Sequence, residues 1–137
     1  MKAFYKTLII TAAILLASSC IKEPYYDGYW EYVNETSLDC MVRIYTDNGH
    51  DFVNLHIPAG DQRISYNEAY DGGSLVLYRY KFATIQFSDG VVVEYTKGDT
   101  RIGNPLIETN YDIQLVDDTC RLTLKITDAI HDAAANQ

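Results

Sequence analysis

Positive charge is scarce in this sequence. Its 137 residues contain 11 Lys and Arg against 19 Asp and Glu, a formal net charge of −8. Nucleic acid would be repelled by this surplus of acid, and no basic cluster with interleaved aromatic residues offsets the repulsion. The same shortage argues against adhesion to an anionic bilayer through basic side chains. Any attachment to a membrane must therefore come from lipid.

Histidines and catalytic motifs are also few. His50, His56 and His131 lack the spacing that would place two metal ligands on one face of a strand or helix. Asp47-Asn48-Gly49-His50-Asp51 is similar to the start of a calcium loop, but the downstream Glu of an EF-hand is missing. Gly-x-Ser-x-Gly, Ser-x-x-Lys and His-Glu-x-x-His are absent, and the acidic residues are scattered through turns. The sequence therefore predicts no metal, no cofactor and no enzymatic activity.

The longest apolar run is too short to span a bilayer, which requires about 20 apolar residues. It extends from Leu8 to Ala17 with only Thr11 polar, follows Lys2 and Lys6, and leads through small residues to Cys20. A basic start, a short apolar run and a small-residue end are typical of a secretory signal that is cleaved off. We therefore expect residues 1–19 to be a signal peptide and Cys20 to be the lipidated first residue of the mature chain.

The segment around Cys20 resembles the bacterial lipoprotein signal, in which the cysteine sulfur receives a diacylglycerol and the peptide is cleaved just before it. Leu usually stands three residues before that cysteine, whereas Ala17 holds the place here and Leu16 lies one residue further back. The alternative is an ordinary cleaved signal that leaves Cys20 as a free thiol. Lys22-Glu23 resembles the surface-export signal of Bacteroidetes lipoproteins. The resemblance implies an outer-membrane lipoprotein, with surface exposure as a further implication.

The part that follows the signal suits one domain. Removing residues 1–19 takes away two Lys and no acid, so 118 residues remain with 9 basic and 19 acidic side chains, a formal charge of −10. This length can bury a real core. We expect residues 20–28, which include Pro24, to be a tether and residues 29–137 to be the folded domain. Tyrosine, with 12 residues in the chain, suits half-exposed sheet positions and binding faces.

The first hairpin has the clearest pattern. Apolar and polar residues alternate from Leu38 to Thr46, and Asn48-Gly49 follows at once. Asn-Gly favours a two-residue type I′ turn because both residues tolerate a positive φ. That turn predicts a register with one apolar face and one mixed face. The apolar pairs are Ile44 with Val53, Val42 with Leu55 and Cys40 with Ile57, and the mixed face pairs Tyr45 with Phe52, Arg43 with Asn54 and Met41 with His56.

Further strands follow. Ser74 to Phe87 is too long for one ordinary strand, so we divide it near Tyr80-Lys81. Ser88-Asp89-Gly90 predicts a three-residue loop with Gly90 left-handed, which places Ile85 opposite Val93. Lys97 to Leu106 is predicted to be a long surface loop.

The last segments predict a hairpin and a helix. Tyr111–Val116 and Arg121–Ile126 flank Asp117-Asp118, with Ile113 and Leu115 facing Leu122 and Cys120. A short helix over Ala129–Ala134, capped by Thr127 or Asp128, would dock Ile130 on the sheet.

About eight short strands joined by hairpins predict an all-β, antiparallel β-sandwich. The VNETS strand end, the FSDG hairpin and the terminal ITDAIHDAA helix, together with the lipidation signal, resemble the small immunoglobulin-like surface lipoproteins of Bacteroidetes. This resemblance implies an immunoglobulin-like fold and carries no biochemical activity with it. The antibody order of Cys, Trp, Cys is absent, because Trp30 precedes Cys40 and no Trp lies between Cys40 and Cys120.

Cys40 and Cys120 remain once Cys20 is assigned to lipid. Both fall on predicted inward faces, in a compartment where disulfides persist. Two alternatives stay open, a disulfide across or along the core and two buried thiols that act as small apolar residues.

Two classes of function fit these features. The first is a non-catalytic lipoprotein that supports or docks onto another envelope protein through a sheet face or edge. The second is a glycan-binding module whose exposed rings stack on sugars. The candidate contact residues for both are Tyr45, Phe52, Arg43, Tyr78 and Tyr80.

Overall fold

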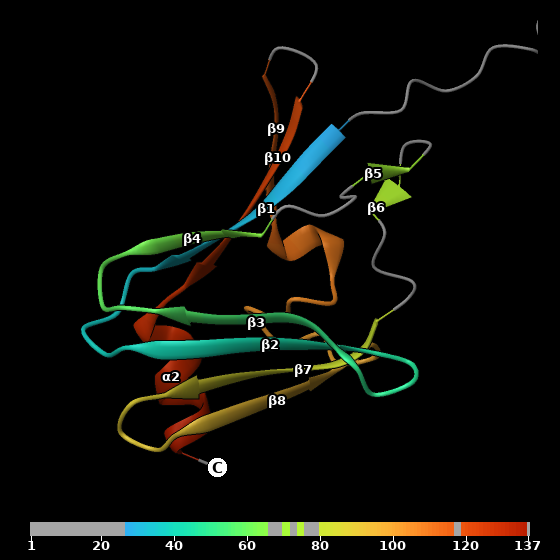
Figure 1. Ribbon diagram of the computed structural model, residues 1–137. Helices are drawn as coiled ribbons and strands as arrows, with labels where there is room; N and C mark the ends of the chain where they lie inside the picture. The colour runs from blue at the N-terminus through green and yellow to red at the C-terminus, as the bar shows by residue number, and fades with distance from the viewer. Residues whose placement is uncertain (1–26, 66–69, 72–73, 76–79, 117–118, 137) are drawn as a thin grey trace, which may run out of the picture.

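The computed structural model describes residues 27–65, 70–71, 74–75, 80–116 and 119–136 (Figure 1). The predicted signal peptide, Cys20 and most of the tether lie outside the described residues. The strands are β1 Asp27–Asn34, β2 Cys40–Thr46, β3 Asp51–Ile57, β4 Gln62–Ser65, β5 Tyr70–Asp71, β6 Ser74–Leu75, β7 Tyr80–Phe87, β8 Val92–Thr96, β9 Asp112–Val116 and β10 Thr119–Ile126. A 3-10 turn, η2, covers Glu108–Asn110, and the helix α2 covers Asp128–Ala135.

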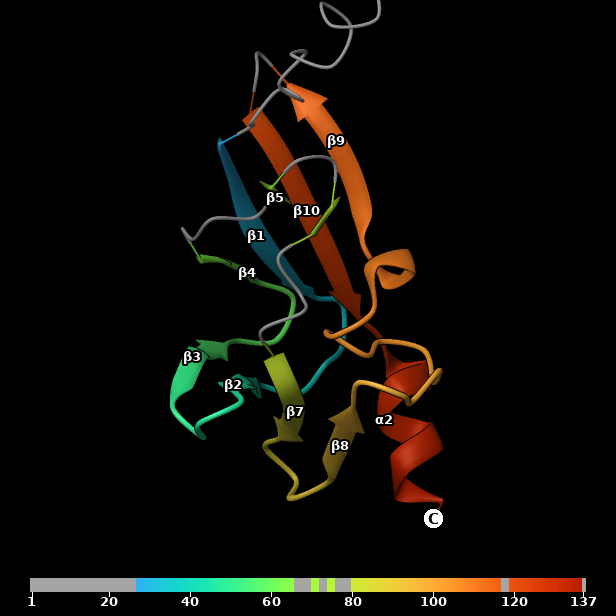
Figure 2. The ribbon, with the colours of Figure 1, turned by 90° about the vertical axis from the view of Figure 1, so that its right-hand side faces the viewer.

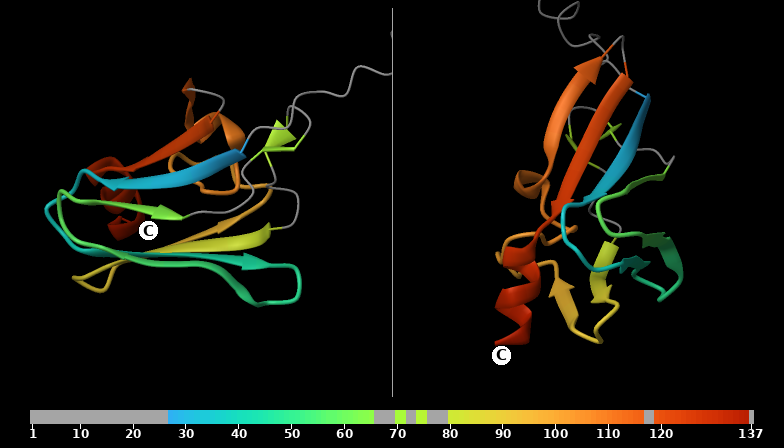
Figure 3. Two further views of the ribbon diagram at one scale, coloured as in Figure 1. Left: turned by 45° about the horizontal axis from the view of Figure 1, so that its top comes forward. Right: turned by 90° about the vertical axis from the view of Figure 1, so that its left-hand side faces the viewer.

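The strands form two four-stranded sheets in separate layers (Figures 1 and 3). Sheet A has the order β4-β1-β10-β9 and sheet B has the order β3-β2-β7-β8, while β5 and β6 pair with each other. The described part of the chain is thus mostly β with one short helix near its end, as the sequence predicts.

One hydrophobic core fills the space between the sheets. Inward residues alternate along the strands, so that Trp30 and Tyr32 on β1 and Leu122 and Leu124 on β10 belong to the same buried cluster as the inner face of sheet B. From sheet B the cluster includes Val42, Ile44, Val53, Ile57, Ala83, Ile85, Phe87, Val93 and Tyr95. Alternation read from the sequence therefore identifies the core faces of β2, β3, β8 and β10, whereas the predicted apolar face of β9 is exposed at Ile113 and Leu115.

The β2–β3 hairpin has the predicted register over most of its length and departs from it at the turn. Ile44 pairs with Val53 as expected, but Tyr45 pairs with Asp51. The amide of Gly49 donates to the carbonyl of Thr46 at 2.9 Å, the amide of Thr46 donates to the carbonyl of His50 at 3.0 Å, and Gly49 has the left-handed φ of 78° expected at the end of a three-residue loop. The predicted two-residue turn is wrong, because the longer loop shifts the register by one residue and leaves Phe52 in a bulge.

The β7–β8 hairpin agrees with prediction in detail. Phe87 donates its amide to the carbonyl of Val91 at 2.8 Å, Gly90 has a φ of 96°, and Ile85 pairs with Val93. β7 begins at Tyr80. Residues 76–79 lie outside the described residues, so the predicted division of Ser74 to Phe87 stays a prediction.

Sheet A contains a parallel pair that the sequence did not predict. β1 runs parallel to β10, from Asp27 opposite Thr119 to Asn34 opposite Ile126. β9 and β10 form the expected antiparallel hairpin, with Leu115 opposite Cys120. An all-antiparallel arrangement is therefore wrong. The error arises because hairpin reasoning pairs strands that are neighbours in sequence, whereas β1 and β10 come from the two ends of the domain.

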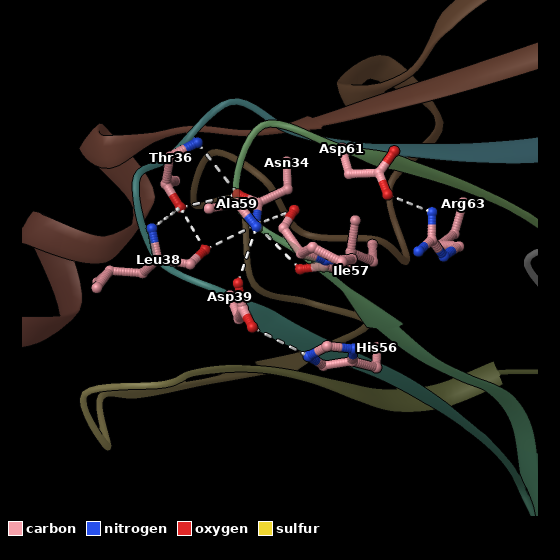
Figure 4. A network of polar contacts seen from close by, with 10 residues as sticks. Asn34, Thr36, Leu38, Asp39, His56, Ile57, Ala59, Asp61 and Arg63 are labelled. Atoms are coloured by element: carbon pink, nitrogen blue, oxygen red, sulfur yellow. Dashed lines mark hydrogen bonds and ion pairs between the residues drawn. The ribbon is translucent and has the colours of Figure 1, made fainter.

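Buried amides fix two of the irregular segments. Asn34 donates its side-chain amide to the carbonyls of Leu38, Ile57 and Pro58 at 2.7, 3.1 and 3.2 Å, and its own Oδ1 accepts from Thr36 (Figure 4). The β1–β2 and β3–β4 connections are tied together in this way. These bonds satisfy backbone carbonyls that would otherwise be left unpaired away from water.

The segment between β8 and β9 was predicted to be a surface loop, yet part of it is buried. Asn104 is fully buried and donates to the carbonyls of Thr96 and Asp99 at 2.9 and 2.6 Å. The Tyr95 hydroxyl donates to the carbonyl of Ile102 at 3.0 Å, and the Tyr111 hydroxyl to that of Pro105 at 2.8 Å. Two tyrosines and one asparagine thus hold the segment against the core.

The terminal helix α2 docks through Ile130, which is 3% exposed, as predicted. It packs over Gly103, whose φ is 75°; a Cβ added there would lie 2.8 Å from Ile130 Cγ1 and closer still to its Cδ1. Thr127 occupies the N-cap position as predicted, but its side chain makes no capping hydrogen bond.

Candidate functional site

The outer face of sheet B contains the most prominent aromatic surface of the described residues. Tyr45 on β2 lies directly opposite Phe82 on β7, and their rings stack with centroids 4.3 Å apart and planes 15° from parallel. Tyr45 is half-buried, and Phe82 keeps 39% of its surface exposed. Offset-stacked rings of this kind are favourable beyond the area that they bury. We call these two residues the aromatic pair.

The structure changes the predicted contact residues. Tyr45 takes part and stacks on Phe82, on the side of β2 away from β3. On the β3 side Tyr45 is opposite Asp51, and the Phe52 side chain lies outside what the structure describes. Tyr80 is 3% exposed and belongs to the core, so its assignment to a contact surface is wrong. The position of Tyr78 lies outside the described residues.

Arg43 is on the same outer face as Tyr45, two residues away on β2. Its Nε donates to Asn54 Oδ1 across the hairpin at 3.5 Å, the pairing that the sequence predicts. Asn54 is exposed and Arg43 is half-buried. The face around the aromatic pair is therefore polar on its β3 side, which is the mixed character expected for a solvent-facing surface.

An open cavity of about 700 Å³ adjoins Phe82. Its walls come from β7, β8, the segment after β8 and the β2–β3 loop, and they contain two cationic and two anionic side chains. The lining residues are Thr46, Asp47, Gly49, Lys81, Phe82, Glu94, Tyr95, Thr96, Lys97 and Gly98. Pockets of this size fall within the range used for small ligands. The balanced charges of the walls favour a neutral, polar ligand or peptide loop over a strongly charged one.

Sequence reasoning missed Phe82 and the cavity for one reason. It assigned the Tyr45 partner from within the β2–β3 hairpin, whereas β2 has a second neighbour, β7. The β7 residue opposite Tyr45 is Phe82, 37 residues further along the chain. The signal was present in the alternation of β7, where Phe82, Thr84 and Gln86 fall on the face opposite to Ala83, Ile85 and Phe87. Only the pairing of β2 with β7 brings this face next to Tyr45.

Cys40 and Cys120 are both free, buried cysteines in the structure. Of the two alternatives, the structure therefore has buried thiols at these positions. Burial, with a smaller contribution from Asp39, raises the pKa of the Cys40 thiol to about 12, and burial also raises the pKa of Cys120. Thiols with raised pKa values are poor nucleophiles at neutral pH, because only the thiolate reacts.

The remaining charged clusters have structural partners. Glu31 is 2% exposed on β1 and accepts from Arg121 Nε and Nη2 at 2.9 and 2.6 Å and from the Thr123 hydroxyl at 3.0 Å. These bonds cross the parallel β1–β10 pair. Removing one partner of such a buried pair costs more than the pair contributes, since the other charge is left uncompensated.

His131 joins α2 to the β7–β8 turn. Its Nε2 lies 2.8 Å from Asp89 Oδ2, its Nδ1 lies 3.1 Å from Asp132 Oδ1, and its ring meets Phe87 edge-on at 5.0 Å. The Asp89 carboxylate, and then that of Asp132, raise the pKa of His131 above its usual value. This histidine therefore links α2 to the β7–β8 turn.

Within the described residues, no group of three or more His, Cys, Asp and Glu side chains is arranged to hold a metal ion. None of the helices described there is long and apolar enough to cross a membrane. Comparison with protein-family models, curated proteins and solved structures gives no match. The resemblance to immunoglobulin-like lipoproteins stays a prediction.

Proposed function

We propose that this protein is a non-catalytic binding or structural module of the cell envelope, attached to the outer membrane by lipid on Cys20. The signal-like residues 1–19 and the small residues before Cys20 support the lipid attachment. The proposal includes an immunoglobulin-like arrangement of the two sheets, supported by seven or more short strands with hairpin connections around one core.

The aromatic pair beside an open cavity carries the binding part of the proposal. Single exposed apolar residues are ordinary on protein surfaces, but a stacked Tyr–Phe pair next to a hollow of about 700 Å³ offers a rigid contact area. Aromatic residues dominate the energetics of interfaces because they bury a large area with few rotamers to order. The first candidate occupant is a segment of another envelope protein.

The second candidate is a glycan, and the cavity is the observation that favours it. Sugar rings need an apolar platform and adjacent polar groups that satisfy their hydroxyls. Phe82 supplies the platform, and Glu94, Asp47 and Lys97 line the same cavity. Carboxylates can accept hydrogen bonds from sugar hydroxyls, and ammonium groups can donate hydrogen bonds to them.

The Phe82→Ala variant tests both candidates, and Val92→Ala is the matched control. Both residues are exposed apolar side chains on the outer face of sheet B, and Val92 does not line the cavity. Loss of a central aromatic contact commonly costs about 2 kcal/mol, which is about a 30-fold weaker affinity. If the ligand is a glycan, we expect Phe82→Ala to lose binding on a glycan array while Val92→Ala keeps it. If the ligand is an envelope protein, we expect Phe82→Ala, but not Val92→Ala, to lose a discrete photo-crosslink formed from a probe at position 45.

Lipid attachment is read separately in intact cells. Cys20→Ser should leave the membrane fraction or stay unprocessed, because acyl chains contribute about 0.8 kcal/mol per buried CH₂ and several chains make attachment stable. Normal detergent partitioning of Cys20→Ser would contradict lipidation. Equal behaviour of Phe82→Ala and Val92→Ala in every binding assay would contradict the assignment of the site.

A further inference from the structure

Among the edges of the two four-stranded sheets, β9 is the one that the described residues leave uncovered (Figures 2 and 3). The β8 edge is occupied, since Arg101 donates to the carbonyl of Glu94 and Asn104 donates to that of Thr96 at 2.9 Å. The other two edges, β3 and β4, lie against each other on the same side of the molecule. No described residue pairs with the outer side of β9.

The surface of β9 is unusually apolar for an edge. Ile113, Leu115 and Val116 are 39%, 57% and 53% exposed, and Asp112–Val116 contains no Lys and no Pro. Natural edge strands are commonly protected from pairing by such residues, by bulges or by a covering element. The inner face of sheet A is buried at Leu122 on β10, whereas Ile113, which is opposite Leu122 on the neighbouring edge strand β9, is exposed. The apolar layer ends at an edge that can accept another strand.

The sequence of β9 is complementary to itself. In an antiparallel pair of two copies centred on Gln114, Ile113 lies opposite Leu115 of the other copy, and Asp112 lies opposite Val116. No like charges face each other in this register. The two Gln114 amides meet on the axis, where each can donate to and accept from the other.

We propose that two copies of this chain associate through β9, forming a continuous sheet across a two-fold axis at Gln114. Five residue pairs make a small interface, below the roughly 1,200 Å² of a stable dimer, so association of freely diffusing copies is weak. Confinement to one membrane raises the effective concentration and favours the pair. That last step rests on the proposed lipid attachment, whereas the pairing itself does not.

The geometry permits both copies to be attached to one membrane. Asp27, where β1 begins, is level with Thr119, which is opposite Val116. In the centred register Val116 of one copy is four residues from Val116 of the other along the strand axis, which is about 13 Å. The seven residues of the tether that precede β1, Cys20 to Tyr26, can span up to about 24 Å. Since antiparallel pairing places the same face of both copies of sheet A on one side, both tethers can reach the same plane.

The test is cysteine trapping in the full chain, both in membranes and as concentrated purified protein. Gln114→Cys places two thiols opposite each other, and Gln86→Cys is the matched control, since Gln86 is exposed on β7 in the interior of sheet B. Gln114→Ser reports any background from the native cysteines. We expect disulfide-linked dimer from Gln114→Cys to exceed that from Gln86→Cys at least tenfold.

A second change shows whether the apolar edge causes the trapping. Adding Leu115→Lys to Gln114→Cys introduces a charge at a position that is already 57% exposed, so the fold should tolerate it, as circular dichroism can verify. Trapping should then fall to the Gln86→Cys level. Equal trapping of Gln114→Cys and Gln86→Cys in both preparations, or trapping that survives Leu115→Lys, would overturn the proposal. If purified Gln114→Cys protein is trapped as a dimer but Phe82→Ala and Val92→Ala behave equally in the binding assays, the β9 pairing would be supported and the proposed binding site refuted.

Discussion

The packing of Ile130 over Gly103 allows a sharp test of how α2 is docked. Gly103→Ala introduces a Cβ that lies 2.8 Å from Ile130 Cγ1 and 3.2 Å from the Tyr95 hydroxyl, with Ile130 Cδ1 closer still. Carbon atoms in van der Waals contact are about 3.5–4.0 Å apart, so the helix or the loop must move. The new side chain must also adopt a φ of 75°, which is unfavourable for any residue with a Cβ.

The two costs can be separated with a control glycine. Gly60 has a φ of 69° and nothing within 4 Å of an added Cβ. Gly60→Ala therefore measures the backbone strain, about 1 kcal/mol, together with the effect of Ala on the unfolded chain. Gly103→Ala adds overpacking of about 1–3 kcal/mol. The total is about 2–4 kcal/mol, a large part of the stability of a typical domain.

The measurement is denaturant unfolding of purified protein, with the slope checked for two-state behaviour. Ile130→Ala in the Gly103→Ala background should recover much of the overpacking cost, so that the double variant is less destabilised than the sum of the two single ones. Equal destabilisation by Gly103→Ala and Gly60→Ala would refute the reasoning. That result would mean that α2 does not pack over Gly103.

The remaining predictions concern pH and thiols. Since Asp89 and Asp132 raise the pKa of His131, this contact stabilises the fold fully below the unfolded pKa of about 6.5, and the contribution disappears as pH rises through the higher folded value. The melting temperature of the wild type should therefore fall between pH 6 and pH 8.5 relative to that of His131→Asn, and parallel profiles would contradict the contact. Cys40 and Cys120 should resist alkylation in the native state and both react on unfolding without reductant, as mass spectrometry can show; an unreactive pair would reveal a disulfide.

Local pattern predicted the hairpins because their determinants lie within a few residues of each other. The alternation of β2 and the Ser88-Asp89-Gly90 turn each define a register without reference to the rest of the chain. The β2–β3 turn shows the limit of this reasoning. Asn48-Gly49 is compatible with two loop lengths, and a difference of one residue places Asp51 instead of Phe52 opposite Tyr45.

Contacts between distant segments were beyond local pattern. Tyr80 reads as an exposed strand residue until β7 is placed beside β2, where it faces the core. Asn104 reads as a loop residue, and its burial depends on carbonyls that only the folded segment brings together. The candidate site was therefore half predicted, with Tyr45 and Arg43 found from sequence and Phe82 and its cavity found from the sheet.

The parallel pairing of β1 and β10 determines how the domain responds to tension. Asp27 and Ile126 lie at opposite ends of the pair, so a pull applied to the two ends of the domain slides one strand along the other. All eight residues of β1 then resist together, whereas a hairpin pulled at its open end separates one pair at a time. Resistance to force is a matter of the unfolding rate, not of equilibrium stability. If the tether holds the start of β1 at a membrane, a force applied beyond the end of β10 acts along these strands, the direction in which sheet A resists separation most strongly.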